Sequence, residues 1–147
     1  MAERRPDRTR GPRHDQFWDW CAKGELRLQK CSSCERLNWP VRVNCEFCGH
    51  GDFAWAAMSG RGKVISWCSF EQDYYAGLLP RPYDCILVEL EEGVLFMSNP
   101  KGFGWQDITP GMPVRLSFID AEDSGGAFQL PVFERAQGIM TPLTNSG

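Results

Sequence analysis

Residues 31–48 read CSSCERLNWPVRVNCEFC, a stretch that places four cysteines in two C-x-x-C pairs separated by ten residues. Two residues between paired cysteines let the backbone curl so that both sulfur atoms face one cation, and the spacer allows a short hairpin to bring the second pair opposite. Soft thiolates in tetrahedral geometry favour zinc. The stretch therefore predicts one zinc ion per chain, bound by Cys31, Cys34, Cys45 and Cys48.

Four protein ligands leave zinc no open coordination position, so the predicted site is structural rather than catalytic. Metal binding of this kind is worth about 10–16 kcal/mol, more than the total stability of many small domains. A redox dithiol would need only one C-x-x-C pair, usually at a helix start in a βαβ unit. His50 follows the second pair closely, and with four cysteines present we expect it to be a surface residue rather than a ligand.

The other three of the seven cysteines, Cys21, Cys68 and Cys85, are scattered singly along the chain. An odd total argues against a complete disulfide framework. Free cysteine is among the most buried residue types, so we expect each of these three to be a small core residue rather than a nucleophile.

Charge is distributed unevenly. The formal net charge is −3, yet residues 1–13 hold five arginines against Glu3 and Asp7. The rest of the chain is therefore acidic, which disfavours binding to phosphate backbones. We expect residues 1–13 to be a disordered basic arm, with a nucleic-acid-binding or partner-binding tail as the alternative.

The fold class is predicted to be mainly β, because the chain is rich in glycine and proline and its apolar runs are short. Phe17, Trp18 and Cys21 fall on one face of a short helix that begins near His14 and ends at Gly24. After the cysteines, Phe53–Met58 is a first apolar run, and five strands follow, which suit a small closed barrel of the oligonucleotide/oligosaccharide-binding (OB) type. The expected strands are 63–71, 83–90, 94–98, 113–119 and 128–134. The expected divisions are the arm 1–13, the helix and zinc ribbon 14–58, the OB barrel 59–136 and a C-terminal tail 137–147.

No apolar run approaches the roughly 18 residues that would span a bilayer, and the charged N-terminus has no apolar stretch behind it. We therefore expect a cytoplasmic protein that does not contact membranes.

Residue patterns for catalysis are missing. The sequence has two histidines, His14 and His50, and it lacks G-x-S-x-G, G-x-G-x-x-G and the P-loop. Glu89, Glu91 and Glu92 lie at a strand end and a turn, where carboxylates are usually solvated. We expect no catalytic residue, and no activity of the chain on its own.

Two loops carry more apolar side chains than loops normally do, namely residues 71–84 (EQDYYAGLLPRPYD) and 99–106 (NPKGFGWQ). Such loops suggest a partner surface or the lip of a ligand site, although they would equally serve to close the ends of the barrel. The candidate residues for binding a partner or lining a substrate channel are Tyr74, Tyr75, Leu79, Arg81, Lys101, Phe103 and Trp105.

The order of motifs resembles one family from about residue 16 to residue 136. The motifs are FWDWCAKGELRLQKCSSC, NWPVRVNCEFCG, SGRGKVISW, CILVELEEG and PGMPVRLSF. They are similar to the DUF thirty-five family, OB-fold proteins with an N-terminal rubredoxin-like zinc ribbon that are associated with acyl-CoA enzymes. The pair Tyr74-Tyr75 departs from the His/Pro-rich loop expected in that family.

The resemblance implies a function. It points to a non-catalytic accessory subunit that pairs with a thiolase-fold protein, as in thiolases and lipid-transfer-protein-type retro-aldolases, in a heteromer such as a heterotetramer. The partner would supply the catalytic groups and share an acyl-CoA substrate, for example a steroid side-chain or aromatic catabolite. The four cysteines match the family's zinc ligands.

Two other functions stay open at this point. One is a single-stranded nucleic-acid-binding module, since zinc ribbons and OB barrels both serve that role. Its weakness is the acidic body, and we expect no nucleic-acid partner. The other is an independent acyl-CoA carrier, which would need more basic residues on the barrel than the sequence provides.

Overall fold

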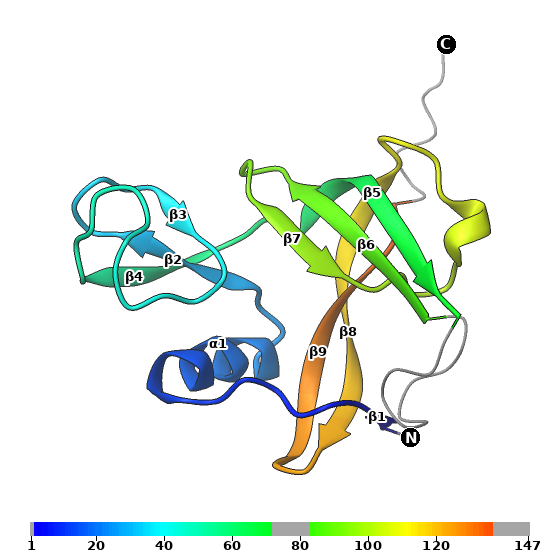
Figure 1. Ribbon diagram of the computed structural model, residues 1–147, viewed down its shortest axis with the longest axis horizontal. Helices are drawn as coiled ribbons and strands as arrows, with labels where there is room; N and C mark the ends of the chain where they lie inside the picture. The colour runs from blue at the N-terminus through cyan, green and yellow to red at the C-terminus, as the bar shows by residue number, and fades with distance from the viewer. Residues whose placement is uncertain (1, 72–82, 137–147) are drawn as a thin grey trace.

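The computed structural model describes residues 2–71 and 83–136 and has two parts joined by an aromatic core. A small three-stranded sheet carries the cysteine loops, and a larger sheet curls into a barrel (Figure 1). The one α-helix of these residues, α1, runs beside strand β9 of the barrel. No helix in the described ranges has the length and apolarity needed to cross a membrane.

Helix α1 spans Pro12–Ala22, two residues earlier than the pattern predicted. Proline fits the first helical position, because its missing N–H group would have no helical partner there. Phe17 and Cys21, four residues apart, are the buried face of the helix, as predicted. At its end, the amide of Gly24 donates to the carbonyl of Cys21, and Gly24 has a φ of 79° that favours glycine.

The ribbon sheet has the order β3-β2-β4, with β2 at Arg27–Cys31, β3 at Leu37–Asn38 and β4 at Phe53–Ala57. Strand β4 is the apolar run expected before the barrel. It pairs antiparallel with β2 so that Cys31 lies opposite Phe53. This pairing closes the base of the loop that carries the remaining cysteines.

The barrel strands are β5 (Arg61–Phe70), β6 (Tyr83–Leu90), β7 (Leu95–Ser98), β8 (Pro113–Asp123) and β9 (Gly126–Arg135). Strand β5 pairs with both β6 and β8, β6 pairs with β7, and β8 pairs with β9. A parallel bridge between Pro100 and Phe133 joins the segment after β7 to β9 and closes the barrel. This five-strand connectivity is that of an OB barrel, so the predicted fold class is confirmed. The segment between β7 and β8 contains the short 3₁₀ helix η1 at Trp105–Asp107.

The register of β5 changes at a bulge between Val64 and Ser66. A bulge adds one residue to a strand and so moves the following side chains to the opposite face of the sheet. Val64 is fully buried, yet Cys68 is exposed. The expectation that Cys68 is a core residue is therefore wrong, and so is the same expectation for its partner Cys85, which is half-buried. Cys21, with no exposed surface, is confirmed as a core residue.

An aromatic column connects the ribbon to the barrel. Trp39 comes from the cysteine loop and lies 4.9 Å, between ring centroids, from both Phe17 of α1 and Phe96 of β7. Phe96 in turn contacts Phe133 of β9 at 6.3 Å. Aromatic pairs at such distances add stabilisation beyond the area they bury, so the column fixes the ribbon against the barrel.

The N-terminal arm differs from the expectation of disorder. Residues Glu3–Arg4 form strand β1, which pairs parallel with β8 at its outer edge (Figure 1). Arg8 forms an ion pair with Asp123 at 2.8 Å, and the two side chains are 9% and 3% exposed. The guanidinium of Arg8 also lies 4.2 Å from the ring centroid of Phe128. Sequence reasoning counted the arginines as a net charge and did not identify their individual partners on the barrel.

The ion pair also lowers the pKa of the Asp123 carboxyl group. The hydrogen bond from Arg8, opposed by burial and supported by backbone amides, lowers the pKa of Asp123 to about 2. Because this pKa lies below the ordinary carboxyl value near 3.9, the pair stabilises the fold fully above about pH 4. The contribution is lost as the pH falls through about 2.

We expect Arg8→Ala to destabilise the protein by on the order of 3 kcal/mol at pH 7, because it leaves the buried Asp123 carboxylate without its charge partner. The matched control is Arg4→Ala. Arg4 is 3.9 Å from Glu122, with side chains 60% and 43% exposed, so no measurable change is expected there. Urea unfolding of the zinc-loaded protein measures both. If Arg8→Ala unfolds at the same urea concentration as Arg4→Ala and the wild type, the arm does not contribute to stability.

Candidate functional site

The four predicted zinc ligands lie on two similar turns. Cys31 ends β2 and Cys34 follows in the next turn, while Cys45 and Cys48 occupy a second turn before β4. In each turn the amide two residues after the first cysteine donates to that cysteine's sulfur, Ser33 to Cys31 and Phe47 to Cys45, both at 3.4 Å.

The residue after each second cysteine has a left-handed backbone. Glu35 has a φ of 64° and Gly49 a φ of 80°. Their amides donate to the carbonyls of Cys31 and Cys45, both at 2.9 Å. The two turns are therefore built alike, although only the second uses the glycine that this conformation favours.

The sulfur positions fit a zinc ion. All four lie within 4.8 Å of one another, and the pairs Cys31–Cys48 and Cys34–Cys45 are 3.5 and 3.6 Å apart. Zinc–sulfur bonds of about 2.3 Å in tetrahedral geometry require sulfur separations of roughly 3.8 Å. The donor set is a complete rubredoxin-like tetrad, which matches the predicted structural zinc.

Hydrogen bonds favour the thiolate form of two of these sulfurs, those of Cys31 and Cys45. Burial opposes ionisation of Cys45, but the side-chain amide of Asn38 donates to its sulfur at 3.5 Å, and backbone amides add to it. Together they lower the pKa of Cys45 to about 6. The amide of Cys34 likewise favours the thiolate of Cys31 and lowers its pKa. The amide of Arg36 favours the Cys34 thiolate too, but burial and the neighbouring thiols outweigh it and raise that pKa to about 11.

Asn38 is a supporting residue that the sequence analysis missed. It is 1% exposed, and its side-chain oxygen accepts from the amide of Glu46 at 2.8 Å. It therefore ties β3 to the second cysteine turn. Its signal was weak because a single asparagine between two cysteine pairs resembles an ordinary turn residue. His50 is exposed and contributes only its backbone carbonyl, which accepts from Cys45.

The predicted binding loops are described only in part. Tyr74, Tyr75, Leu79 and Arg81 lie outside the described residues. In the second loop, Trp105 is 41% exposed on η1, and its amide donates to the Asp84 carboxylate at 3.1 Å. Phe103 packs partly against the core with the guanidinium of Arg135 over its ring, and the Lys101 ammonium donates to Ser117.

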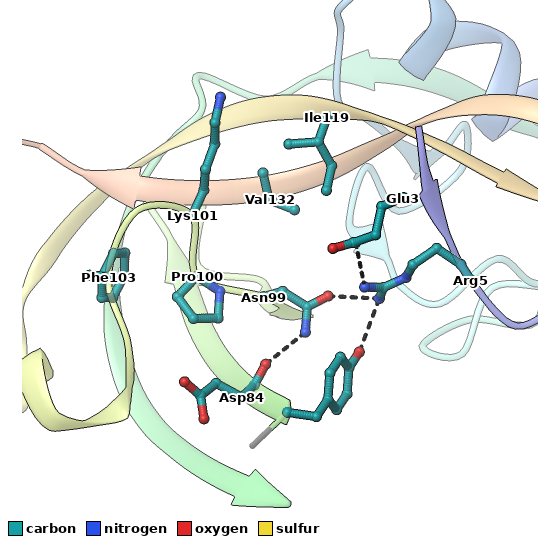
Figure 2. Close-up of a pocket in the computed structure, with 10 residues that line it drawn as sticks. Glu3, Arg5, Asp84, Asn99, Pro100, Lys101, Phe103, Ile119 and Val132 are labelled. Atoms are coloured by element: carbon teal, nitrogen blue, oxygen red, sulfur yellow. Dashed lines mark hydrogen bonds and ion pairs between the residues drawn. The ribbon is translucent and has the colours of Figure 1, made fainter. Parts of the chain in front are cut away.

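A groove of about 330 Å³ lies where this loop meets the N-terminal arm. Figure 2 shows the residues that line it. The arm supplies Arg5, whose guanidinium donates to Asn99 at 2.9 Å and to the Tyr83 hydroxyl at 3.0 Å. Lys101 and Phe103 line the same groove, so the structure brings two of the predicted residues together. The sequence placed Tyr83 and Asn99 in the two candidate loops without assigning them a role, and it missed Arg5, because the proximity of the three residues depends on the arm folding back onto the barrel.

Neither histidine belongs to a nucleophile–base pair in the described part of the chain. His14 lies on α1 and His50 on the cysteine loop, and neither ring bonds a serine or cysteine side chain there. The fold and site together define a zinc-ribbon protein with an OB barrel, whose metal site holds no open coordination position.

Comparison with known proteins identifies the family. Residues 18–54 match the family model described as the rubredoxin-like zinc ribbon domain of ChsH2, and residues 55–118 match that of the C-terminal OB-fold domain of ChsH2. The chain belongs to this ChsH2/DUF35 family, which confirms the resemblance found in the sequence.

Curated relatives carry subunit names. A "Probable enoyl-CoA hydratase alpha subunit" of Thermomonospora curvata is 33% identical over 84% of this chain and 38% of its own length. A "3-oxo-4,17-pregnadiene-20-carboxyl-CoA hydratase alpha subunit" of Mycobacterium tuberculosis is 32% identical over 73% of this chain and 34% of its own length. The chain thus spans about a third of the length of these two relatives. A DUF35 domain-containing scaffold protein of Pyrococcus furiosus is 32% identical over 59% of this chain and 63% of its own length.

Solved structures agree with the fold. A chain of the "Ltp2-ChsH2(DUF35) aldolase" superposes with a TM-score of 0.77 at 28% identity, over 88% of this chain and 99% of that chain. A DUF35 protein of unknown function from Sulfolobus solfataricus, at 20% identity and a TM-score of 0.54, covers 72% of this chain and 78% of its own and shows the fold alone.

We expect purified protein to contain one zinc per chain and to unfold on removing it. The double variant Cys31→Ser plus Cys45→Ser should bind no zinc and lose the ribbon, because structural zinc supplies on the order of 10 kcal/mol of folding free energy. Metal analysis and circular dichroism with and without a chelator measure both effects. The matched control, Cys21→Ala, removes a buried thiol outside the tetrad and should keep its zinc. A double variant that folds normally would contradict the structural role.

Proposed function

We propose that this chain is a non-catalytic accessory subunit of a heteromeric enzyme that makes or breaks C–C bonds in acyl-CoA substrates, with a thiolase-fold protein as its partner. The observation that carries the proposal is the superposition on a chain of the Ltp2-ChsH2(DUF35) aldolase across 99% of that chain. The hydratase alpha-subunit names of the curated relatives also support a heteromer that acts on acyl-CoA.

The metal centre supports a scaffolding role. Four thiolates complete the zinc coordination, so the ion has no position for a substrate or an activated water. What the centre does is hold the cysteine loop in one shape. That loop presents Trp39 to the barrel core and so holds the ribbon against the barrel, an arrangement suited to support another subunit.

The outer face of the barrel supports a protein partner over a nucleic acid. In OB folds the second and third strands form the usual ligand face. Here those strands are β6 and β7, and their outward side chains include Leu87, Leu95 and Met97, the last two 48% and 59% exposed. The neighbouring Lys63 of β5 is paired with Glu89 at 3.6 Å. An apolar face with its cation already paired is unsuited to a phosphate backbone and suited to a protein surface.

The loop that carries Phe103 and Trp105 is the proposed contact with the partner or its substrate channel. Trp105 projects from η1 with 41% of its surface exposed, and the groove beside it contains the charged side chains of Arg5 and Lys101. Tyr74, Tyr75, Leu79 and Arg81 belong to the same proposal from sequence. The groove also holds the carboxylates of Glu3 and Asp84, and Glu3 pairs with Arg5 at 3.0 Å. Lys101 is therefore the cation in this groove that could meet an acyl-CoA phosphate, while Phe103 offers an apolar surface to the acyl chain.

The test is purification of the tagged chain from its native host with its stoichiometric partner. We expect a thiolase-fold protein in the complex, C–C bond cleavage or formation on an acyl-CoA by the complex, and none by the isolated chain. Turnover by the isolated chain would overturn the accessory role. A stoichiometric hydratase-type partner would replace the thiolase-fold assignment.

Within such a complex, Trp105→Ala should weaken association roughly thirtyfold, because losing an aromatic anchor at an interface hot spot costs about 2 kcal/mol. The matched control is Val43→Ala, which removes an exposed apolar side chain, 59% exposed, from the ribbon. Affinity is measured by biolayer interferometry on zinc-loaded variants. Unchanged affinity for Trp105→Ala would show that the loop only closes the barrel, and a loss confined to Val43→Ala would move the interface to the ribbon.

A further inference from the structure

Two cysteines outside the zinc site face each other across the barrel sheet. Cys68 of β5 and Cys85 of β6 are direct partners in an antiparallel pair. The bulge between Val64 and Ser66 turns Cys68 outward, so both thiols lie on the outer face, opposite the core side chains of Val64 and Val88. Cys68 is exposed and Cys85 half-buried.

The backbone geometry is that of a disulfide site. Directly opposed residues in antiparallel strands have Cα atoms about 4.5–5.5 Å apart, and disulfides form across Cα separations of about 4.4–6.8 Å. The pairing therefore meets the Cα separation that a disulfide requires. The thiols also interact electrostatically, since burial and then the charge of Cys68 raise the pKa of Cys85. The side-chain amide of Asn99 lies 3.9 Å from the sulfur of Cys85.

We propose that Cys68 and Cys85 form a redox-active dithiol that closes to a cross-strand disulfide by exchange with a low-molecular-weight disulfide. The exposed Cys68, as its thiolate, attacks one sulfur of the small disulfide and expels one thiolate, which takes up a proton. The result is a mixed disulfide at Cys68. Cys85, after giving its proton to solvent, attacks the Cys68 sulfur as a thiolate and expels the second small thiolate, which takes up a proton. Two protein thiols are oxidised, and one small disulfide is reduced to two thiols.

The reaction leaves the rest of the structure intact. The barrel core lies on the other face of β5 and β6, and the four zinc ligands lie in the ribbon, so neither needs to change. The new bond would tie the end of β5 to the start of β6, on the same outer face as Leu87 and Met97. Exposed cross-strand disulfides are readily reduced, which suits a reversible modification.

The experiment exposes the zinc-loaded full chain to oxidised glutathione, alkylates the remaining thiols and maps peptides by mass spectrometry alongside zinc analysis. We expect one disulfide peptide joining Cys68 to Cys85 with zinc retained. In Cys85→Ser the reaction should stop at the mixed disulfide between Cys68 and glutathione. The wild type should accumulate at least about tenfold less of the mixed disulfide at Cys68 than Cys85→Ser does, because the neighbouring Cys85 thiol acts at a high effective concentration. Cys68→Ser should react more slowly than Cys85→Ser, because Cys85 is half-buried.

Cys21→Ala is the control for an unrelated thiol and should form the same disulfide as the wild type. The proposal is overturned if the wild type accumulates glutathione on Cys68 without closing. It is equally overturned if disulfides form among Cys31, Cys34, Cys45 and Cys48 with loss of zinc while Cys68 and Cys85 stay reduced. Addition of excess dithiothreitol should restore both thiols, and failure to do so would contradict the reversible form.

Discussion

Four sulfur atoms within 4.8 Å of one another cannot all be anions unless a cation lies between them, and this constraint organises the N-terminal half of the chain. The loop from Cys31 to β4 has only the two-residue strand β3 as regular structure. Its shape depends on metal coordination and on amide–sulfur hydrogen bonds rather than on a hydrophobic core of its own. Since Trp39 belongs to this loop, the metal also determines whether the aromatic column reaches the barrel.

The sequence predicted the parts of the structure that depend on local spacing. The zinc ligands follow from two C-x-x-C pairs. Strand β6 occupies the predicted residues 83–90 because it contains the apolar run CILV and ends at the turn Glu91-Glu92-Gly93. Strand β4 was expected only as an apolar run, and its pairing with β2 depends on residues more than twenty positions away. Strands β8 and β9 extend beyond prediction because their hairpin continues to Gly126, where polar residues pair through the backbone.

The remaining differences come from long-range contacts and register. The arm is ordered because Arg8 and Asp123, 115 residues apart, form a buried pair, which no local pattern records. Cys68 faces outward because one bulged residue in β5 reverses the alternation. The groove in Figure 2 depends on Arg5, Tyr83 and Asn99 meeting from three segments, so its residues become visible only once the barrel and arm are assembled. An OB barrel supports many functions, so the barrel by itself does not assign one.

The column from Phe17 through Trp39 to Phe96 gives the protein an intrinsic optical probe. An indole held 4.9 Å from two other rings, at tilts of 40° and 35°, is fixed in an asymmetric setting, and such a setting produces near-ultraviolet circular dichroism. Trp39 is one of six tryptophans, but it is carried by the metal-dependent loop while Phe96 belongs to the barrel, so the part of this signal that changes on metal removal reports the coupling of the two halves of the molecule. Zinc binding in the ribbon can thus be followed by near-ultraviolet circular dichroism, without any added label.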